Sequence, residues 1–361
     1  MNELDEILQC ICRLTLPPWN HCVPSDLTTK KITGGLTNEL YSVSYCDGQD
    51  TSHILVRIFG KSDGLLNREV ENEIFISLSN KNISPRLMGV YPWGRIEEFL
   101  FDRKPLSSGT DMVRMDRELD CVELIAKALQ SLHSTSLDLD PSRASANIFK
   151  VLEKWLCLAS KYGSCIRVSP RCPEFETPSI ESLSREVEYV TRKVREKLFS
   201  HKSVVSNKLC QRLLARVLCH NDMLSGNIML NEVDKSVRLI DFEYAGMNHA
   251  AADIANVFTA VCESIMLSGQ AQDVKLNFPS EAIQKHFLEC YLGESITDRD
   301  LRVILTVISG FAMADELRWT IWGIIQASQS EVDFDYVFYY HSRFNAYREY
   351  VNIFTSRYSL L

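Results

Sequence analysis

The chain has 361 residues, 45% of them hydrophobic, and a formal net charge of −8. This length and apolar content supply a large core and indicate two lobes. The net charge argues against nucleic acid or an anionic membrane as the main partner. The 12 cysteines include no Cys-x-x-Cys pair, so reduced thiols are expected rather than a zinc finger. An acidic N-terminus and the lack of a long apolar run predict a cytoplasmic protein with no signal peptide or membrane span.

Turn signals and short apolar runs alternate over the first hundred residues. The apolar stretch at 7–16 predicts a helix that ends at Pro17-Pro18. Gly34-Gly35, followed by Thr37 and Asn38, predicts a turn that leads into a strand. Glycines there allow backbone amides to approach a phosphate closely, although a plain β-turn is the alternative.

Arg57 is the only charge in the apolar run 53–59, which predicts a buried strand. Because a buried cation needs a partner or a ligand, Arg57 is a candidate for binding nucleotide phosphates. An arginine that reaches water from a strand end is the alternative. Residues 65–78 show helical spacing, and Glu71 on that helix is a candidate partner for Arg57 or for metals, unless it belongs to a solvated face.

A hairpin is predicted over residues 87–101, and its second strand ends near Glu98 and Phe99. After about residue 105 the chain becomes mostly helical. Helices are predicted at 121–132, 148–162 and 180–199, with a Pro- and Ser-rich loop at 163–178.

Residues 220–227 carry the pattern His-x-Asp-x4-Asn between apolar runs at 213–219 and 228–230. A polar turn then leads to a second strand, predicted to run from Val237 to Glu243. The order of strand, polar loop and hairpin is typical of a kinase-like phosphoryl-transfer site. A solvated turn with carboxylates at strand ends explains the isolated motif, but not its full context.

Phosphoryl transfer requires an acceptor hydroxyl in line with the γ-phosphate and a metal that neutralises the phosphate charge. Asp222 is the candidate base that accepts or orients the hydroxyl proton. Asn227 and Asp241 complete the catalytic set, because Mg²⁺ prefers hard oxygen ligands. Glu243, two residues further along the predicted strand, is expected to face the same side as Asp241 and support the metals.

Two helices are predicted in the last third of the chain. The first, at 250–266, carries Asp253, which we expect to brace the catalytic loop. The second carries Trp319 and Trp322, three residues apart on one face, and Tyr339 follows. Such a face is ordinarily core packing. Aromatic faces also attract an ammonium group by about 1–2 kcal/mol each when desolvated, so these rings are a candidate acceptor site.

Taken in chain order, these motifs resemble the choline/ethanolamine kinase family. They extend from about residue 31 to 350. The stretches that carry the resemblance are Thr33-Gly34-Gly35-Leu36-Thr37-Asn38, Val56-Arg57-Ile58-Phe59-Gly60, Arg95-Ile96-Glu97-Glu98-Phe99, Cys219-His220-Asn221-Asp222 with Gly226-Asn227, Ile240-Asp241-Phe242-Glu243-Tyr244 and Trp319-x-x-Trp322.

The resemblance implies an α+β, protein-kinase-like two-lobed fold. It implies a small β-rich nucleotide-binding lobe at 1–104 and a larger, mostly helical lobe for catalysis and acceptor binding at 105–361. The implied activity is transfer of the ATP γ-phosphate, with Mg²⁺, to the hydroxyl of choline or ethanolamine. This reaction is the first step of phosphatidylcholine and phosphatidylethanolamine synthesis. Family members are often homodimers.

The resemblance also implies individual roles. Asp222 is carried over as the base, Asn227 and Asp241 as metal ligands, and Glu243 as their support. Nucleotide contacts are implied for Gly34, Gly35, Thr37, Asn38, Arg57, Glu71, Glu98 and Phe99. The aromatic wall around the ammonium group is implied for Tyr244, Trp319, Trp322 and Tyr339.

One departure from the family concerns the acceptor. Where the family has Asn-x-Phe-x-Glu, this chain has Ala260 in place of the glutamate, and Glu263, Asp315 or Glu316 are the nearest substitutes. The lost carboxylate favours choline, whose methylated cation suits aromatic faces. The stretches His-Asn-Asp-Met-Leu and Glu-Tyr-Ala-Gly-x-Asn are closer to ethanolamine kinases. Choline, ethanolamine or both stay open, as do an aminoglycoside-like phosphotransferase and a catalytically inactive kinase-like scaffold.

Overall fold

The computed structural model describes residues 7, 9–11, 14, 18–32, 37–48, 50–60, 64–162, 169–172, 177–267 and 278–361, without the side chains of 262–267. The chain divides into two compact units, Met1–Lys104 and Pro105–Leu361. Gly34 and Gly35, for which nucleotide contacts are predicted, lie outside the described residues, as does most of the loop at 163–178.

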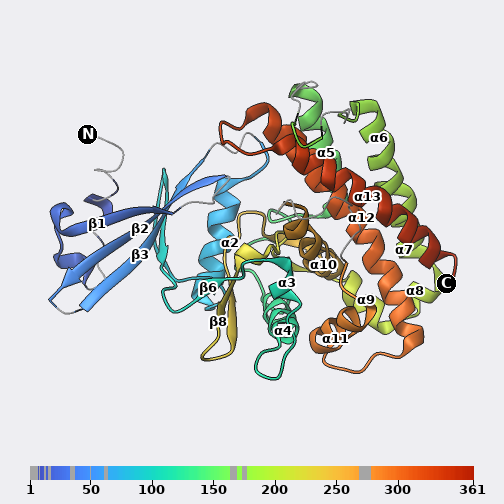
Figure 1. Cartoon of the computed structure of the whole chain (residues 1–361), viewed down its shortest axis with the longest axis horizontal. Helices are drawn as coiled ribbons and strands as arrows, with labels where there is room; N and C mark the ends of the chain where they lie inside the picture. Colours follow the sequence, from blue (N-terminus) through green and yellow to red (C-terminus); the bar gives the residue numbers. More distant parts are fainter. Residues whose placement is uncertain are drawn as a thin grey trace. The chain divides into compact units, whose positions relative to one another are not determined.

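The N-terminal unit is built on a five-stranded antiparallel sheet in the order β1-β2-β3-β5-β4 (Figure 1). Helix α2 begins after Asn67, whose side chain accepts a hydrogen bond from the Val70 amide. Alternate side chains of the strands, among them Val43, Val56 and Ile96, form the core of this unit. The elements are η1 (Trp19–His21), η2 (Pro24–Asp26), β1 (Leu27–Ile32), β2 (Asn38–Asp47), β3 (Asp50–Phe59), α2 (Arg68–Asn80), β4 (Leu87–Tyr91) and β5 (Gly94–Glu98).

The register between β3 and β5 places Arg57 directly opposite Arg95. Like charges in such a cross-strand pair destabilise a sheet. Both arginines are nevertheless buried, at 2% and 0% exposure. The sheet therefore requires carboxylates beside this pair, and Glu97 lies two residues further along β5, on the same face as Arg95.

The C-terminal unit is mainly helical. Strands β7 and β10 form an antiparallel pair, and β8 and β9 form a hairpin. Strand β6 (Lys104–Pro105) lies at the boundary of the units. The elements are α3 (Gly109–Met112), α4 (Cys121–His133), α5 (Ile148–Tyr162), α6 (Ile180–Glu188), the π-helical η3 (Tyr189–Val194), α7 (Arg195–Ser200), α8 (Lys202–Val205), α9 (Lys208–Leu214), β7 (Arg216–Cys219), η4 (Ser225–Asn227), β8 (Ile228–Asn231), β9 (Ser236–Leu239), β10 (Gly246–His249), α10 (Ala250–Leu267), α11 (Glu281–Leu292), α12 (Asp298–Gln329) and α13 (Tyr336–Tyr358).

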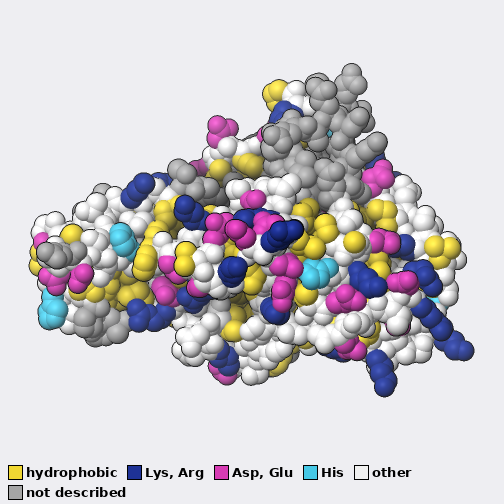
Figure 2. Space-filling view, turned by 60° about the horizontal axis from the view of Figure 1, so that its bottom comes forward, with side chains coloured by type: hydrophobic (Ala, Val, Ile, Leu, Met, Phe, Trp, Pro, Cys, Tyr) yellow, Lys and Arg dark blue, Asp and Glu magenta, His cyan; other side chains and the backbone are white. Residues whose placement is uncertain are grey.

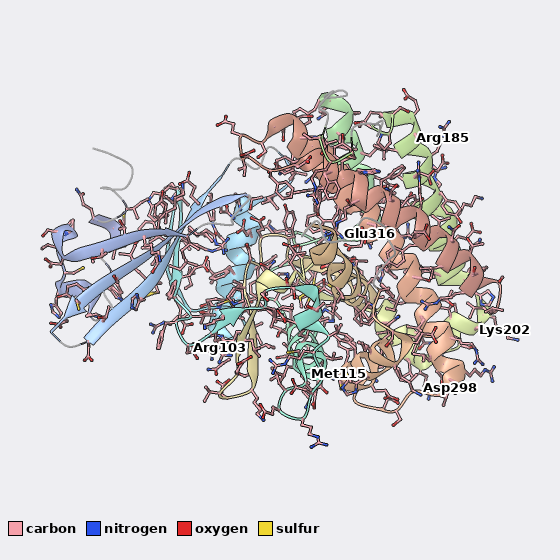
Figure 3. The ribbon with its side chains drawn as sticks, in the orientation of Figure 1. Arg103, Met115, Arg185, Lys202, Asp298 and Glu316 are labelled. Atoms are coloured by element: carbon pink, nitrogen blue, oxygen red, sulfur yellow. The ribbon has the colours of Figure 1, made fainter. Side chains whose placement is uncertain are left out.

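Helix α12 is the centre of this unit. Its side chains are buried on all sides along most of its length, as expected of a helix that is covered by others. Helices α13, α10 and α5 pack on it, and α12 and α13 lie side by side (Figure 1). Glu316 lies in the interior of this helical unit, whereas Arg185 and Lys202 lie at its periphery (Figure 3). Helix α12 can therefore present polar groups to several neighbouring elements.

The α+β class that the sequence predicts is confirmed, and two local predictions are wrong. The strand predicted to reach Glu243 ends at Leu239, because Asp241 adopts a left-handed backbone with φ 64°. Residues 244–248, which the sequence predicts to be a loop ahead of the helix at 250–266, include most of β10 (Gly246–His249). A Cβ at Gly246 would lie 2.5 Å from the Ala144 carbonyl oxygen, so glycine allows the close approach at this strand.

Surface charge agrees with the composition. Acidic and basic side chains are interspersed on the face that Figure 2 shows, without one large patch of a single sign. Among the helices that the structure describes, none has the length and apolar character required to cross a bilayer.

Candidate active site

The loop between β7 and β8 brings Asp222 and Asn227 into contact. The Asn227 Nδ2 donates to the Asp222 carbonyl oxygen at 2.9 Å and to its carboxylate Oδ2 at 3.1 Å. The Asp222 side chain is only 7% exposed. The amide of Asn227 thus fixes the direction of the Asp222 carboxylate.

Asp241 joins these residues through the β8–β9 hairpin. Ile228 pairs with Leu239, so the residues just outside this pair, Asn227 and Ile240, are neighbours at the open end of the hairpin. The Ile240 amide donates to the Asn227 carbonyl oxygen at 3.0 Å, and Asp241 follows directly. The hairpin therefore delivers Asn227 and Asp241 from two strands to one end of the same small sheet.

The oxygen atoms at this hairpin end suit a magnesium ion. The Asn227 Nδ2 is used by Asp222, so its Oδ1 is the atom that it can offer to a metal. Asp241 adds a carboxylate, and both are hard oxygen donors. Glu243 is buried but lies in a turn rather than on a strand, so the strand alternation that linked it to Asp241 is wrong. Its role as a metal support stays a prediction.

His220 lies next to this loop as a buried, neutral imidazole. Burial lowers the pKa of its imidazole, which outweighs the opposing effect of Asp253, so the ring is neutral at pH 7. Its Nε2 lies 2.8 Å from the Ile240 carbonyl oxygen, which can only accept, so this nitrogen carries the proton. The ring also packs on Phe242. His220 thereby joins the catalytic loop to the residue that precedes Asp241.

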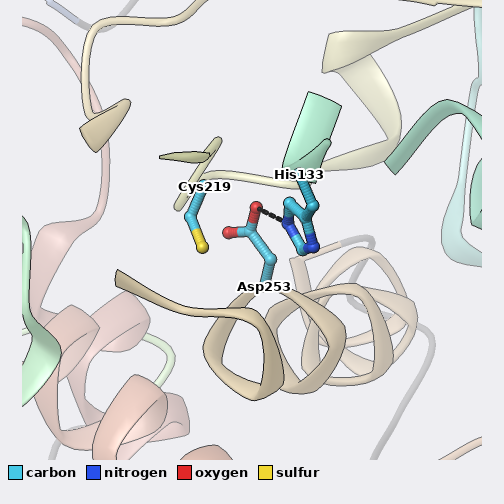
Figure 4. Close-up of side chains that lie close together, drawn as sticks. All are labelled: His133, Cys219 and Asp253. Atoms are coloured by element: carbon cyan, nitrogen blue, oxygen red, sulfur yellow. Dashed lines mark hydrogen bonds and ion pairs between the residues drawn. The ribbon is translucent and has the colours of Figure 1, made fainter. Parts of the chain in front are cut away.

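Asp253 braces the catalytic loop, as predicted. Its Oδ2 accepts from the His220 amide and its Oδ1 from the Asn221 amide, both at 2.6 Å. His133 Nε2 lies 3.0 Å from the same Oδ2 (Figure 4). Burial raises the pKa of the Asp253 carboxyl, but the hydrogen bond from His133 and the nearby groups lower it more. The ionised carboxylate therefore holds two consecutive amides of the loop.

His133, Cys219 and Asp253 lie close enough together to resemble a metal site (Figure 4). Their hydrogen bonds indicate a structural role. Both Asp253 oxygens accept N–H donors, and the His133 Nδ1 lies 2.7 Å from the Tyr291 hydroxyl. Burial raises the pKa of the Cys219 thiol well above its ordinary value, whereas metal binding requires the thiolate.

A second brace comes from α10 and α12. Asn256 accepts a hydrogen bond from the Met223 amide and donates through its Nδ2 to Asp315 at 3.0 Å. Asp315 also accepts from the Thr259 hydroxyl at 2.8 Å and from Arg318 at 2.8 Å. Three donors thus converge on Asp315, so its carboxylate belongs to the support of the loop.

The four residues predicted to bind the acceptor form one aromatic cluster, defined as Tyr244, Trp319, Trp322 and Tyr339. Ring centroids lie 5.4 Å apart for Tyr244 and Trp319, 5.6 Å for the two tryptophans, and 5.5 Å for Trp322 and Tyr339. The Trp322 Nε1 donates to the Tyr244 hydroxyl at 2.8 Å. Trp155 on α5 packs edge-on against Tyr244 and Trp319 and extends the cluster.

The carboxylates considered as substitutes at Ala260 have partners of their own. Ala260 is buried on α10. Asp315 is held by the donors described above, and Glu316 pairs with Arg343 at 3.2 Å. The side chain of Glu263 lies outside the described residues. Asp315 and Glu316 are thus already engaged by donors of the protein, and which carboxylate replaces the missing glutamate stays open.

The N-terminal unit gathers several residues predicted to bind the nucleotide. Glu97 accepts from Arg57 Nε at 2.9 Å and from Arg95 Nε at 2.7 Å. Glu71 pairs with Arg95 and with Arg68, each at 2.7 Å. Arg57 is therefore not exposed at a strand end, and it pairs with Glu97. Its predicted pairing with Glu71 stays a prediction.

Asn38 belongs to the same network, because Arg68 Nη2 donates to its Oδ1 at 3.0 Å. Glu98 accepts from the Arg86 amide at 3.0 Å, and Phe99 packs near His53. The contacts described for Glu98 and Phe99 do not show whether these residues, or Thr37, bind the nucleotide. These contacts stay predictions.

Sequence reasoning did not single out Arg68, Arg95 and Glu97. The signal that marks two of them is Arg95-Ile96-Glu97, which places opposite charges on one face of a buried strand. Burial opposes ionisation of Glu97, but the attraction of Arg57 and Arg95 lowers the pKa of its carboxyl overall. Arg95 is stacked 4.1 Å from the centroid of Phe75, which adds a cation–π contact.

Comparison with known proteins agrees with this geometry. A β-rich unit followed by a helical unit with the loop of Asp222 is the architecture of a kinase-like phosphotransferase. The family model described as choline/ethanolamine kinase matches residues 29–348. The chain belongs to the choline/ethanolamine kinase family, and it is a kinase that uses an alcohol as acceptor.

Three similar proteins illustrate the family. The probable choline kinase 1 of Arabidopsis thaliana is 29% identical over 88% of this chain and 84% of its own length. A crystal structure of choline kinase from Cryptosporidium parvum superposes with a TM-score of 0.74 and 27% identity, over 98% of this chain and 96% of the other. Plasmodium vivax ethanolamine kinase gives 0.73 and 25%, over 99% and 92%. An aminoglycoside-like activity is therefore not favoured.

Proposed function

We propose that the protein transfers the γ-phosphoryl group of ATP to the hydroxyl of choline, ethanolamine or both. Asp222 acts as the base, and Asn227 and Asp241 hold Mg²⁺. The observation that carries the proposal is the junction at the hairpin, where Asn227 binds the Asp222 carboxylate and its carbonyl accepts the amide that precedes Asp241. Cytoplasmic location, expected from the composition, and homodimer formation, implied by the family resemblance, stay predictions.

The reaction requires little covalent assistance from the protein. The acceptor oxygen forms a bond to the γ-phosphorus while the bond from that phosphorus to the oxygen of the leaving ADP breaks. The hydroxyl proton passes to the Asp222 carboxylate, which Asn227 holds in one direction. A fixed carboxylate orients the acceptor for in-line attack, which lowers the barrier by positioning rather than by strong proton abstraction.

A magnesium ion would supply positive charge that offsets the charge of the phosphates. Asn227 Oδ1 and the Asp241 carboxylate would hold it, with Glu243 as the predicted support. The left-handed backbone at Asp241 supports this role, because such strained residues are concentrated at functional sites. On the nucleotide side, we propose that Arg57 contributes positive charge for the phosphates and that Asn38 and Glu71 hold the surrounding network.

The aromatic cluster is proposed to surround the ammonium group. The Trp319 ring packs edge-on against both Tyr244 and Trp322, with centroids 5.4 Å and 5.6 Å apart. Choline has no N–H donor and suits such walls, whereas ethanolamine gains from additional acceptors. Ala260 removes one acceptor, so cation–π attraction carries a larger share of ammonium binding in this chain.

The test measures ATP consumption by the purified protein with choline and with ethanolamine, side by side, with Asp222→Asn as the control. Phosphorylation of at least one acceptor is expected, and we expect Asp222→Asn to lower kcat by about 10²–10⁴-fold without loss of folding. Full activity of that variant would contradict the assignment of the base. If neither acceptor is phosphorylated although ATP is bound, the proposed role of the aromatic cluster is wrong.

Binding of ATP with Mg²⁺ is the finer part of the proposal, and a thermal shift tests it directly. A ligand that binds the native state raises stability by mass action. We expect ATP with Mg²⁺ to raise the melting temperature of the protein. The absence of any shift at millimolar ATP would contradict the proposed nucleotide and metal contacts.

A further inference from the structure

Asn221, the residue before the proposed base, is held at every polar atom. Its backbone is left-handed, with φ 64°. Its amide donates to Asp253, its Nδ2 donates to the Tyr244 carbonyl oxygen, and its Oδ1 accepts from Asn248. A non-glycine residue keeps such a conformation only where the surroundings fix it. The direction of Asp222 therefore depends on how firmly Asn221 is held.

Arg318 provides the remaining contact. Its Nη2 donates to the Asn221 carbonyl oxygen at 2.6 Å and to Asp315 Oδ1 at 2.8 Å. Arg318 lies 97 positions from Asn221 in the sequence, on α12. It is only 4% exposed. A charged donor on a carbonyl oxygen in such a site is a strong, directional contact.

The same guanidinium contacts the aromatic cluster. Its carbon lies 4.5 Å from the centroid of Trp319, the next residue on α12. A second path also leads from the cluster to Asn221. Trp322 donates to the Tyr244 hydroxyl, and the Tyr244 carbonyl accepts from Asn221 Nδ2. The residues proposed to bind the acceptor and the residue that precedes the base are thus parts of one bonded network.

We propose that Arg318, held by Asp315, is a positioning residue that sets the catalytic loop relative to the aromatic cluster. This inference rests on the proposed function, since it takes Asp222 as the base. It acts on the direction of the Asp222 carboxylate and not on the nucleotide. Loss of Arg318 should therefore lower kcat while the KM for ATP stays close to that of the wild type.

The buried ion pair of Glu316, the residue that follows Asp315 on α12, provides a matched control. Glu316 pairs with Arg343, which is 1% exposed and lies 5.2 Å from the centroid of Tyr339. Both pairs are buried, and both arginines stack on a ring. Arg343 binds Glu316 on α12. Arg318 differs because it also binds the backbone of the catalytic loop at Asn221. The double variants Asp315→Asn/Arg318→Met and Glu316→Gln/Arg343→Met remove both charges of each pair, so neither leaves an uncompensated buried charge.

Kinetics and amide hydrogen exchange of the full chain, together with melting temperatures, give the test. Asp315→Asn/Arg318→Met is expected to lower kcat by about 10–100-fold, the range for a slightly misplaced catalytic group. Amide exchange at residues 220–223 should become faster. Glu316→Gln/Arg343→Met should lose comparable thermal stability but keep the protection of these amides. Arg318→Lys, which restores the cation, should recover part of kcat.

Two results would overturn the inference. One is an unchanged kcat and unchanged amide protection in Asp315→Asn/Arg318→Met. The other is an equal loss in both double variants, in proportion to their melting temperatures. Asp222→Asn separates this from a failure of the proposed function. If Asp222→Asn is active, the assignment of Asp222 as the base is wrong. If Asp222→Asn is inactive but Asp315→Asn/Arg318→Met is fully active, only the role of Arg318 is wrong. The exchange measurement decides the role of Arg318 even if neither acceptor is phosphorylated.

Discussion

The two units contain buried charge networks of different construction. In the N-terminal unit, Arg57, Arg95, Glu71 and Glu97 pair side chain to side chain. In the C-terminal unit, Asp253 and Arg318 direct their charges at backbone groups of the catalytic loop. Pairing among side chains neutralises charge inside a sheet. Bonds to the backbone instead fix a strained loop conformation. The comparison indicates that the first network maintains a set of cations, whereas the second maintains a geometry.

The largest effect is expected where a charge holds the backbone. Asp253→Asn replaces one of two acceptor oxygens by an amide that faces N–H donors of the loop or His133. We expect a loss of about 3–5 kcal/mol in the free energy of unfolding, as for other broken buried charge contacts. The expected loss in kcat is at least about 10²-fold, because the loop loses its register. Urea unfolding and steady-state kinetics provide the measurements.

Asp298→Asn is the control for this variant, because the Asp298 side chain is 85% exposed and pairs only at the surface with Lys285. It should change stability by no more than about 1 kcal/mol. If Asp253→Asn is as mild as Asp298→Asn, the contacts of Asp253 with the loop do not maintain the geometry, and the contrast between the two networks fails.

The sequence predicts local features well, and the two networks show where this ability ends. Helical spacing predicts helices at 121–132 and 148–162, and the structure has α4 at Cys121–His133 and α5 at Ile148–Tyr162. The apolar runs at 213–219 and 228–230 similarly predict a loop at 220–227, and the structure has this loop between β7 and β8. These features depend on spacing within one segment.

The partners of the buried charges depend on distant segments. Glu97 joins Arg57 because of the β3–β5 register, and no periodicity within either strand specifies that register. Arg318 reaches Asn221 across 97 positions. Strand β10 also escaped prediction, because its partner β7 precedes it by more than a hairpin loop. Tertiary packing selects these pairs from many that are chemically acceptable.

A smaller loss of stability is expected when the side-chain network of the N-terminal unit is broken at Glu97. The dependence of stability on pH reveals this contribution. Because Arg57 and Arg95 hold the pKa of Glu97 below its ordinary value, ionised Glu97 stabilises the folded state above the unfolded pKa of about 4.3. This contribution is lost as the pH falls through the lower pKa of the folded state. Glu97→Gln should lower the free energy of unfolding at pH 7 by about 3 kcal/mol, since it leaves two buried arginines with less negative charge.

Guanidinium unfolding at pH 7 and at pH 4 tests this prediction. Asp253 also has a lowered pKa, so acid weakens both units of the wild type. Glu97→Gln removes only the pH-dependent stability that comes from the N-terminal unit. The difference in the free energy of unfolding between this variant and the wild type should therefore become smaller at pH 4. An equal difference at both pH values would show that Glu97 is not the titrating group. The KM for ATP should rise, whereas the KM for the acceptor should not.

The smallest effect is expected at the edge of the second network, where Trp322 reaches Asn221 only through Tyr244. Trp322→Phe keeps an aromatic ring but loses the hydrogen bond to the Tyr244 hydroxyl. One such bond and a small packing defect amount to about 1–2 kcal/mol. The expected result is a KM for the acceptor raised several-fold, with kcat lowered less than in the Arg318 variants.

Trp155→Phe is the control, because Trp155 packs on the same rings and its replacement leaves the Trp322–Tyr244 bond intact. If both variants raise the KM equally, ring area rather than the bonded path determines acceptor binding, and the geometry that the C-terminal network maintains ends at Arg318.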